Sequence, residues 1–251
     1  MSSETSVITR MQSLIQQWEK DSDDKAVFLK CYMMMTSNML MSIDQAEFND
    51  PVWVDRLLNR FADYYFVALE AYEQYPVNSP LVWHLAHDVT RSTHSSALQK
   101  LLLGVNAHIN YDLVLTLVDV LQADWPDLTD EQRAARYADH CRVNEVIGST
   151  IDAVQDQVLE PASPALDLVD RLLGPIDEML ISRLISRWRE DVWQNAVHLL
   201  ETGEMDQQVQ LIRKIEQDAL EIGETICLND RPSWVSVRKQ QDTTRHTPIQ
   251  D

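Results

Sequence analysis

The sequence predicts an all-α protein, and three observations carry this prediction. Hydrophobic residues recur at intervals of three and four over long stretches, which is the periodicity of helices buried on one side. No stretch of strand length alternates hydrophobic and polar residues between glycine-rich turns. Every proline falls at an expected helix start or in a connection. We therefore expect one domain, residues 1–228, built as a bundle of about eight helices.

The first part of the bundle is expected to contain three amphipathic helices and a short fourth one. The first three are expected at about residues 5–20, 24–41 and 51–72. The third has a strong start signal, because Asp50 can cap the helix and Pro51 suits its first position. Ser79-Pro80 predicts the same kind of start for the fourth helix, which ends before a Ser/Thr-rich turn at residues 92–96.

Residues 96–121 are expected to form the central helix, because this segment is hydrophobic nearly all round. At about 100° per residue, six side chains share one line along it: Leu98, Leu101, Val105, His108, Asp112 and Leu115. His108 and Asp112 therefore lie within an apolar stripe. We expect Leu101, Val105 and Ile109 to be fully buried.

A long helix is expected after the central one. Thr129 and Gln132 have the spacing of a capping box, in which each side chain binds the other residue's backbone N–H. The helix that they start should end near Leu159. Its expected buried stripe comprises Val143, Ile147, Ile151, Val154 and Val158. Extended towards the N-terminus, this stripe reaches His140 and Asn144.

The last part of the chain is expected to contain two more helices and a tail. The first helix starts at Ser163-Pro164, and Gly174-Pro175 interrupts it before it continues to about residue 203. The second covers about residues 209–226. Residues 229–251 are polar and lack helical periodicity, so we expect them to be disordered.

Composition excludes several classes of protein. The net charge of -19 creates a negative field that repels nucleic acid and anionic membrane surfaces, so we expect neither as a partner. The five glycines are too far apart for a phosphate-binding loop. The three cysteines fit neither a disulfide framework nor a cysteine-based zinc site. Because the N-terminus has no signal-peptide pattern and no run of about 18 apolar residues occurs, a soluble cytoplasmic protein is expected.

The polar residues of the central helix are the strongest candidates for a functional site. His108 and Asp112 are four residues apart, so they project from one face. Buried polar groups need partners, and a lone ionised carboxylate is too costly to bury. His84 and Asp88 repeat the spacing on the preceding helix, and Asp63 interrupts a hydrophobic helix surface. These five residues are the candidate ligands for a divalent metal ion.

The segment GVNAHINYDL, residues 104–113, resembles the signature of an uncharacterised bacterial family, domain of unknown function 5995. Other positions agree with that family's pattern: Phe48-Asn49-Asp50-Pro51, Phe61-Ala62, Tyr65, Asp139, Val143-Asn144, Arg189, Trp193 and Ala196. The resemblance covers about residues 25–200 and implies an all-α fold. It also implies six positions of interest: Asn106, His108, Asn110, Asp112, Asp139 and Asn144. It implies no particular activity.

Two hypotheses about function remain open. In the first, the protein is an enzyme centred on His108 and Asp112, with Asp139 and Asn144 contributing from the next long helix. A divalent metal would favour hydrolysis of a small-molecule substrate, whereas without a metal His108 would act as a general base oriented by Asp112.

In the second hypothesis the protein binds or scaffolds partners without catalysis, and its buried polar residues form a structural network. Asp112 would then accept a hydrogen bond from a neighbouring Trp, Tyr, Arg or Asn. The other buried polar residues expected in such a network are Asn106, Asn110 and His140.

Overall fold

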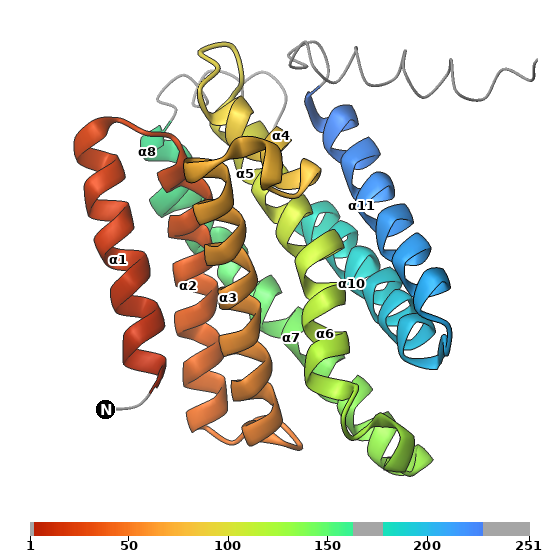
Figure 1. Ribbon diagram of the computed structural model, residues 1–251. Helices are drawn as coiled ribbons and strands as arrows, with labels where there is room; N and C mark the ends of the chain where they lie inside the picture. Colours follow the sequence, from red (N-terminus) through yellow and green to blue (C-terminus); the bar gives the residue numbers. More distant parts are fainter. Residues whose placement is uncertain (1–2, 163–177, 228–251) are drawn as a thin grey trace, which may run out of the picture.

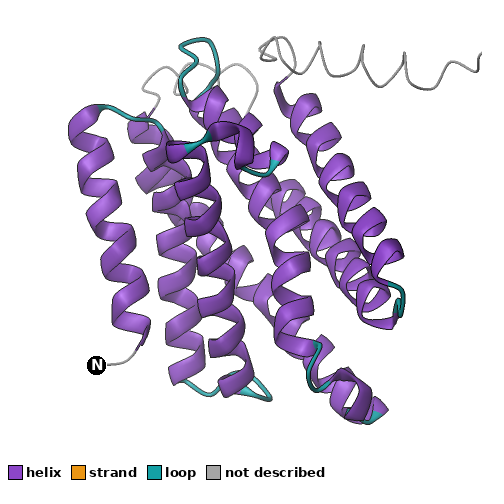
Figure 2. Cartoon of the chain, in the orientation of Figure 1, coloured by secondary structure: helices purple, strands orange, loops and turns teal. Residues whose placement is uncertain are grey.

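The computed structural model describes residues 3–162 and 178–227, and every regular element within these ranges is helical (Figure 1; Figure 2). The α-helices are α1 (Ser3–Asp21), α2 (Lys25–Asp44), α3 (Pro51–Gln74), α4 (Leu81–Thr90), α5 (Ala97–Ala107), α6 (Leu113–Leu121), α7 (Asp130–Val154), α8 (Glu160–Ala162), α10 (Glu178–Glu201) and α11 (Met205–Cys227). Two π-helical turns, η2 (His108–Asp112) and η4 (Gln155–Leu159), join α5 to α6 and α7 to α8. The described residues thus form eight continuous helices, and the all-α prediction is confirmed.

Two predicted helix starts are confirmed by their caps. The Asp50 carboxylate accepts a hydrogen bond from the Trp53 backbone N–H at 2.9 Å, and α3 begins at Pro51. At the start of α7, the Gln132 N–H donates to Thr129 Oγ1 at 3.3 Å, and the Thr129 N–H donates to the Gln132 side chain at 2.9 Å. Each cap satisfies backbone donors that the first helical turn leaves free.

The predicted cap of α4 is wrong, because Ser79 does not cap the helix and Pro80 is not its first residue. Pro80 occupies the position before the helix, and the Ser79 hydroxyl donates to the Pro76 carbonyl instead of capping α4. The Leu81 N–H donates to the Glu216 carboxylate of α11 at 2.6 Å. A distant side chain therefore supplies the cap, which local sequence spacing does not reveal.

The continuous helix from α5 through η2 to α6 occupies the centre of the bundle. In Figure 1, α1, α2 and α3 lie on one side of it and α10 and α11 on the other. It packs against α2, α3, α4, α10 and α11. Two groups of buried hydrophobic side chains surround it, and Phe61 and Val105 pack against both groups. The predicted central helix is thus at the junction of the two halves of the core.

Burial along the central helix follows the prediction except at one position. Leu101 and Ile109 are buried, but Val105 is only half-buried. The prediction for Val105 is wrong: its side chain lines a cavity that Leu101 and Ile109 also border, and it is the least covered of the three. The helix start expected at Ser163-Pro164, the interruption expected at Gly174-Pro175 and the tail expected at 229–251 lie outside the described residues, whereas the later part of that helix is α10.

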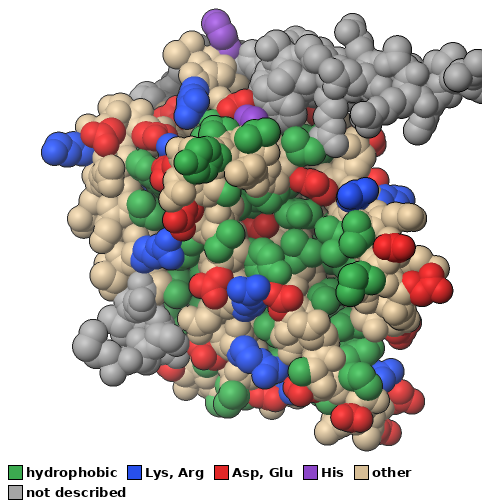
Figure 3. Space-filling model, in the orientation of Figure 1, with side chains coloured by type: hydrophobic (Ala, Val, Ile, Leu, Met, Phe, Trp, Pro, Cys, Tyr) green, Lys and Arg blue, Asp and Glu red, His purple; other side chains and the backbone are tan. Residues whose placement is uncertain are grey.

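Two helices are long and apolar enough to cross a membrane by length and composition alone: α2 and the continuous helix Ala97–Leu121. Within the bundle, 39% of the apolar 18-residue segment of α2 is buried, and 61% of the corresponding segment of Ala97–Leu121. A buried core helix of a soluble protein meets the same criterion. On the face seen in Figure 3, hydrophobic side chains gather between α6 and α11, with acidic and basic side chains around them. The expected cytoplasmic location stays a prediction.

Candidate active site

His108 and Asp112 form a buried pair on the π-helical turn η2. His108 Nδ1 lies 2.9 Å from Asp112 Oδ2, and the two residues are 3% and 1% exposed. The same carboxylate oxygen accepts a hydrogen bond from Trp83 Nε1 at 2.9 Å. The expectation that Asp112 would accept from an aromatic or amide donor is therefore confirmed. A π-helical turn inside an α-helix is frequent at functional sites.

Burial shifts both groups of the pair towards their uncharged forms. It lowers the pKa of His108 well below 6.5 and raises the pKa of Asp112 well above 3.8, while the Trp83 hydrogen bond opposes the second shift. His108 is therefore an uncharged imidazole at neutral pH. Because Asp112 Oδ2 already accepts from Trp83, we assign Nδ1–H of His108 as a second donor to it, which leaves the lone pair on Nε2.

Aromatic side chains fix the orientation of the imidazole ring. Phe61 of α3 stacks on it with a centroid separation of 3.5 Å and an interplanar angle of 6°. Tyr32 of α2 meets it edge-on at 4.4 Å. Within the described residues, His108 Nε2 and the Tyr32 hydroxyl are both buried without a hydrogen-bond partner. Two polar atoms are thus left free in an otherwise hydrophobic environment.

These two side chains line a cavity of about 180 Å³ between α2, α3, α5, η2, α7 and α10. Most of its wall is hydrophobic. The remaining lining side chains are Cys31, Tyr32, Thr36, His108, Gln155 and Arg189. Thr36 is already engaged, since its hydroxyl donates to the Tyr32 carbonyl at 2.8 Å. An apolar chamber of this size with a few polar groups is typical of a small-molecule site.

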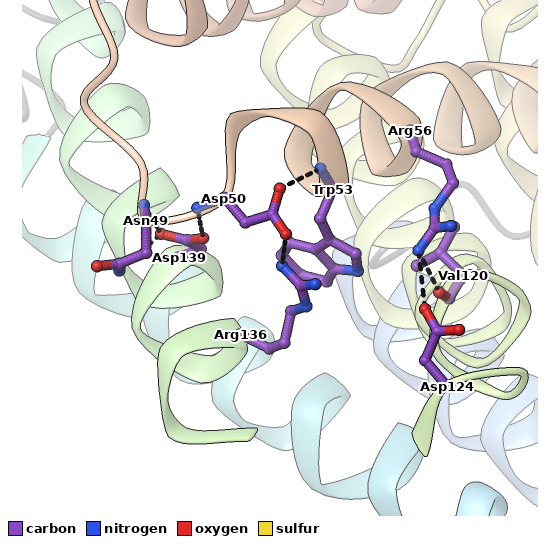
Figure 4. A network of polar contacts seen from close by, with 8 residues as sticks. All are labelled: Asn49, Asp50, Trp53, Arg56, Val120, Asp124, Arg136 and Asp139. Atoms are coloured by element: carbon purple, nitrogen blue, oxygen red, sulfur yellow. Dashed lines mark hydrogen bonds and ion pairs between the residues drawn. The ribbon is translucent and has the colours of Figure 1, made fainter. Parts of the chain in front are cut away.

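The structure places Asp139 in a different network, at the start of α3 (Figure 4). Its carboxylate accepts from the backbone and side-chain nitrogens of Asn49, at 2.7 and 2.9 Å, and from the Asp50 backbone N–H at 2.9 Å. Asp50 in turn caps α3 and pairs with Arg136. Asp139 therefore fixes the connection between α2 and α3, and it does not line the cavity.

His140 and Asn144 hold a buried arginine that was not among the predicted site residues. Arg189 Nε donates to Asn144 Oδ1 at 2.8 Å, and Arg189 Nη2 donates to the His140 carbonyl at 2.6 Å. His140 Nε2 lies 2.9 Å from the Arg189 carbonyl. The family pattern includes Arg189, but its burial follows only from the packing of α10 on α7, which places it in the cavity wall.

The remaining candidates are separate from this pair. His84 Nε2 and Asp88 Oδ2 are 3.5 Å apart on α4, where the Tyr72 hydroxyl donates to Asp88. Asp63 is exposed and lies 3.9 Å from Arg60. Among residues 3–162 and 178–227, no three His, Cys, Asp or Glu side chains come together as a metal-binding group. The structure therefore does not gather the five predicted ligands at one place.

A buried asparagine ties the central helix to α11, and a second, half-buried asparagine one turn later supports it. Asn106 is fully buried and its Nδ2 donates to the Ala219 carbonyl at 2.8 Å. Asn110 is half-buried, and its Nδ2 donates to Asn106 Oδ1 at 2.8 Å. Their side chains thus have partners, as buried polar groups require, and their role is to hold these helices together.

Comparison with known proteins agrees with the family pattern in the sequence. A model of DUF5995, described as a family of unknown function, matches residues 5–229. No curated protein and no solved structure matches the chain significantly.

Proposed function

Because the chain belongs to DUF5995, a family of unknown function, we propose an activity from its site alone: acid–base catalysis on a small, mainly apolar molecule held in the cavity. His108 is the general base, and Asp112 is the positioning residue that orients it. The pair offers two metal ligands at most, and zinc normally takes three or more from a protein. The proposal therefore uses the acid–base chemistry of the pair itself.

One observation carries the proposal: His108 lines the cavity and its Nε2 is buried without a partner among the described residues. Leaving such an atom unsatisfied costs about 1–3 kcal/mol, so a ligand that satisfies it gains that interaction. The Tyr32 hydroxyl, which lies near the Thr36 side chain, is a second group for orienting the same ligand.

Two opposing effects act on Nε2 as a proton acceptor: burial lowers the pKa of His108, and the hydrogen bond from Nδ1–H to Asp112 favours the charged ring. As Nε2 takes a proton from the bound molecule, the ring becomes an imidazolium, and Asp112 stabilises its positive charge through Nδ1–H. Trp83 holds the carboxylate, and Phe61 holds the ring plane. The hydrophobic wall strengthens these electrostatic interactions because it excludes water. General-base catalysis of this kind accelerates a reaction by roughly 10²–10⁴-fold.

Benzisoxazole is a suitable probe, because its ring opening requires only a positioned base. The base removes the proton at C3, the C–H electron pair completes the nitrile, and the N–O bond breaks to give 2-cyanophenolate. The cavity of about 180 Å³ is somewhat larger than the roughly 150 Å³ cavity known to admit benzene. The appearance of the phenolate is followed by absorbance at saturating probe concentration.

We expect saturable turnover that His108→Gln reduces by roughly 10²-fold or more, and that Asp112→Asn reduces less. His94→Gln is the matched control, because His94 is exposed and does not line the cavity. Equal rates for His108→Gln and the control would refute the general-base role. Saturable binding of the probe without turnover would favour the second candidate, a binding protein, which the complete Trp83–Asp112–His108 hydrogen-bond chain also permits.

A further inference from the structure

Arg189 gives the cavity a charge that the acid–base site does not use. Its side chain belongs to α10, is 4% exposed and lines the cavity. Its hydrogen bonds go to two acceptors of α7, Asn144 Oδ1 and the His140 carbonyl. Both acceptors are uncharged. They fix the Nε and Nη2 corner of the guanidinium, and Nη1 donates no hydrogen bond to a described residue.

The nearby groups do not neutralise this cation. No described carboxylate forms an ion pair with Arg189, although the chain has 40 acidic residues against 21 basic ones. The His140 ring lies beside it, and burial together with Arg189 lowers the pKa of that ring well below 6.5. Burial lowers the pKa of Arg189 to about 10, so the guanidinium stays protonated at neutral pH.

Buried charges in proteins are normally paired, since an isolated one loses its hydration without compensation. In a chain with this excess of carboxylates, an unpaired arginine in the wall of an apolar cavity is left for an anion from outside. Nη1 keeps its two N–H donors, and a carboxylate can accept a charge-assisted hydrogen bond from it. A carboxylate also suits the cavity because its single negative charge is equal in magnitude to the positive charge of Arg189.

We propose that the natural ligand of this cavity is a small carboxylic acid with an apolar body, whose carboxylate pairs with Arg189. The inference rests on the proposed function, since it names the class of molecule on which the His108–Asp112 pair acts. The apolar body contacts hydrophobic wall residues such as Leu58, Ile147 and Ile185. Arg189 binds the anionic end, and His108 faces another part of the same molecule.

Hexanoate and 1-hexanol form a matched pair of probes, because they share the apolar chain and differ in the charged end. Binding of each is measured by isothermal titration calorimetry at neutral pH. We expect the wild-type protein to bind hexanoate at least tenfold more tightly than 1-hexanol. Arg189→Met should abolish that preference and leave 1-hexanol binding unchanged. Arg187→Gln, an exposed arginine on the same helix, is the matched control and should keep the preference.

A wild-type measurement keeps the proposal testable if Arg189→Met does not fold. With hexanoate labelled with ¹³C at the carboxyl group, the bound ligand should titrate at a lower pH than free hexanoate, because Arg189 favours the ionised form. A higher titration pH, or equal affinity for the two probes, would overturn the carboxylate proposal and leave the cavity site intact. Failure of hexanoate, 1-hexanol and benzisoxazole alike to bind would overturn both proposals.

Discussion

Gly104 lies so close to α2 that adding one methyl group at this position should disturb the packing around the site. It lies in α5 opposite Phe28 of α2, and a Cβ added at Gly104 would lie 2.5 Å from two ring carbons of Phe28 and 2.9 Å from its Cβ. Phe28 cannot easily move, because its ring also contacts Tyr65 and Trp83. Gly104→Ala should therefore force α2 and α5 apart.

The size of the effect follows from two opposing contributions. Replacing glycine by alanine inside a helix contributes about 1 kcal/mol of stability. Overpacking a filled core costs about 1–3 kcal/mol. Gly104→Ala should cost an amount near the upper end of this range, because the contacts are short and the Phe28 ring is held in place. The expected net loss is about 2 kcal/mol, or about 4–8 °C in melting temperature for a protein of this size.

Gly148→Ala is the matched control for this prediction. Gly148 lies within α7, and among the described residues an added Cβ there would approach only Ser182 Oγ, at 3.7 Å. Without a clash, the gain in helix propensity should raise the melting temperature by about 2–4 °C. Both variants are compared by thermal denaturation followed by circular dichroism. If Gly104→Ala melts at or above the temperature of Gly148→Ala, the close contact between α2 and α5 is refuted.

Three further predictions follow from the core and its buried histidine residues. Leu101→Ala should cost about 2–5 kcal/mol in urea denaturation, because Leu101 is buried and already borders the cavity, and a loss below about 1 kcal/mol would contradict its place in the core. Burial, with Lys25 adding to it, lowers the pKa of His87 to about 3, and His140 is shifted in the same direction. The His87 ring takes up a proton only on unfolding between about pH 4 and 6, so its contribution to stability should fall as the pH falls, by about 1.4 kcal/mol per pH unit, and the lowered pKa values of His140 and His108 act in the same direction. His87→Phe should reduce that slope by one ring's share, and an unchanged slope would show that His87 is protonated in the folded protein. Because no three potential ligands of a metal meet among the described residues, a strong chelator should leave the melting temperature unchanged, whereas a lowered melting temperature would reveal a stabilising metal.

Much of the architecture was predictable because it depends on local patterns. The periodicity around the central helix predicted its burial, and the spacing of Thr129 and Gln132 predicted the cap of α7. The cap of α4 was not predictable, since it comes from Glu216, 135 residues away in the chain. Local spacing specifies interactions within a turn or two, whereas contacts between helices depend on their packing.

The candidate site shows the same division. His108 and Asp112 were predictable as a pair, because residues four apart share a helix face. Asp139 was also a candidate in the sequence, yet packing places it at the start of α3. Arg189 was missed as a cavity residue, because only the packing of α10 against α7 buries it. Sequence thus identified the polar groups, and packing decided which of them meet.

Nitrogen NMR tests directly whether His108 presents an unprotonated Nε2 to the cavity. The protein is labelled with ¹⁵N-histidine, and the His108 signals are identified by their loss in His108→Gln. At pH 7 we expect an uncharged ring protonated on Nδ1, with an Nε2 signal that shifts when phenol is added and does not shift with toluene, which lacks a donor. A ring protonated on Nε2, or an imidazolium at pH 7, would contradict this expectation.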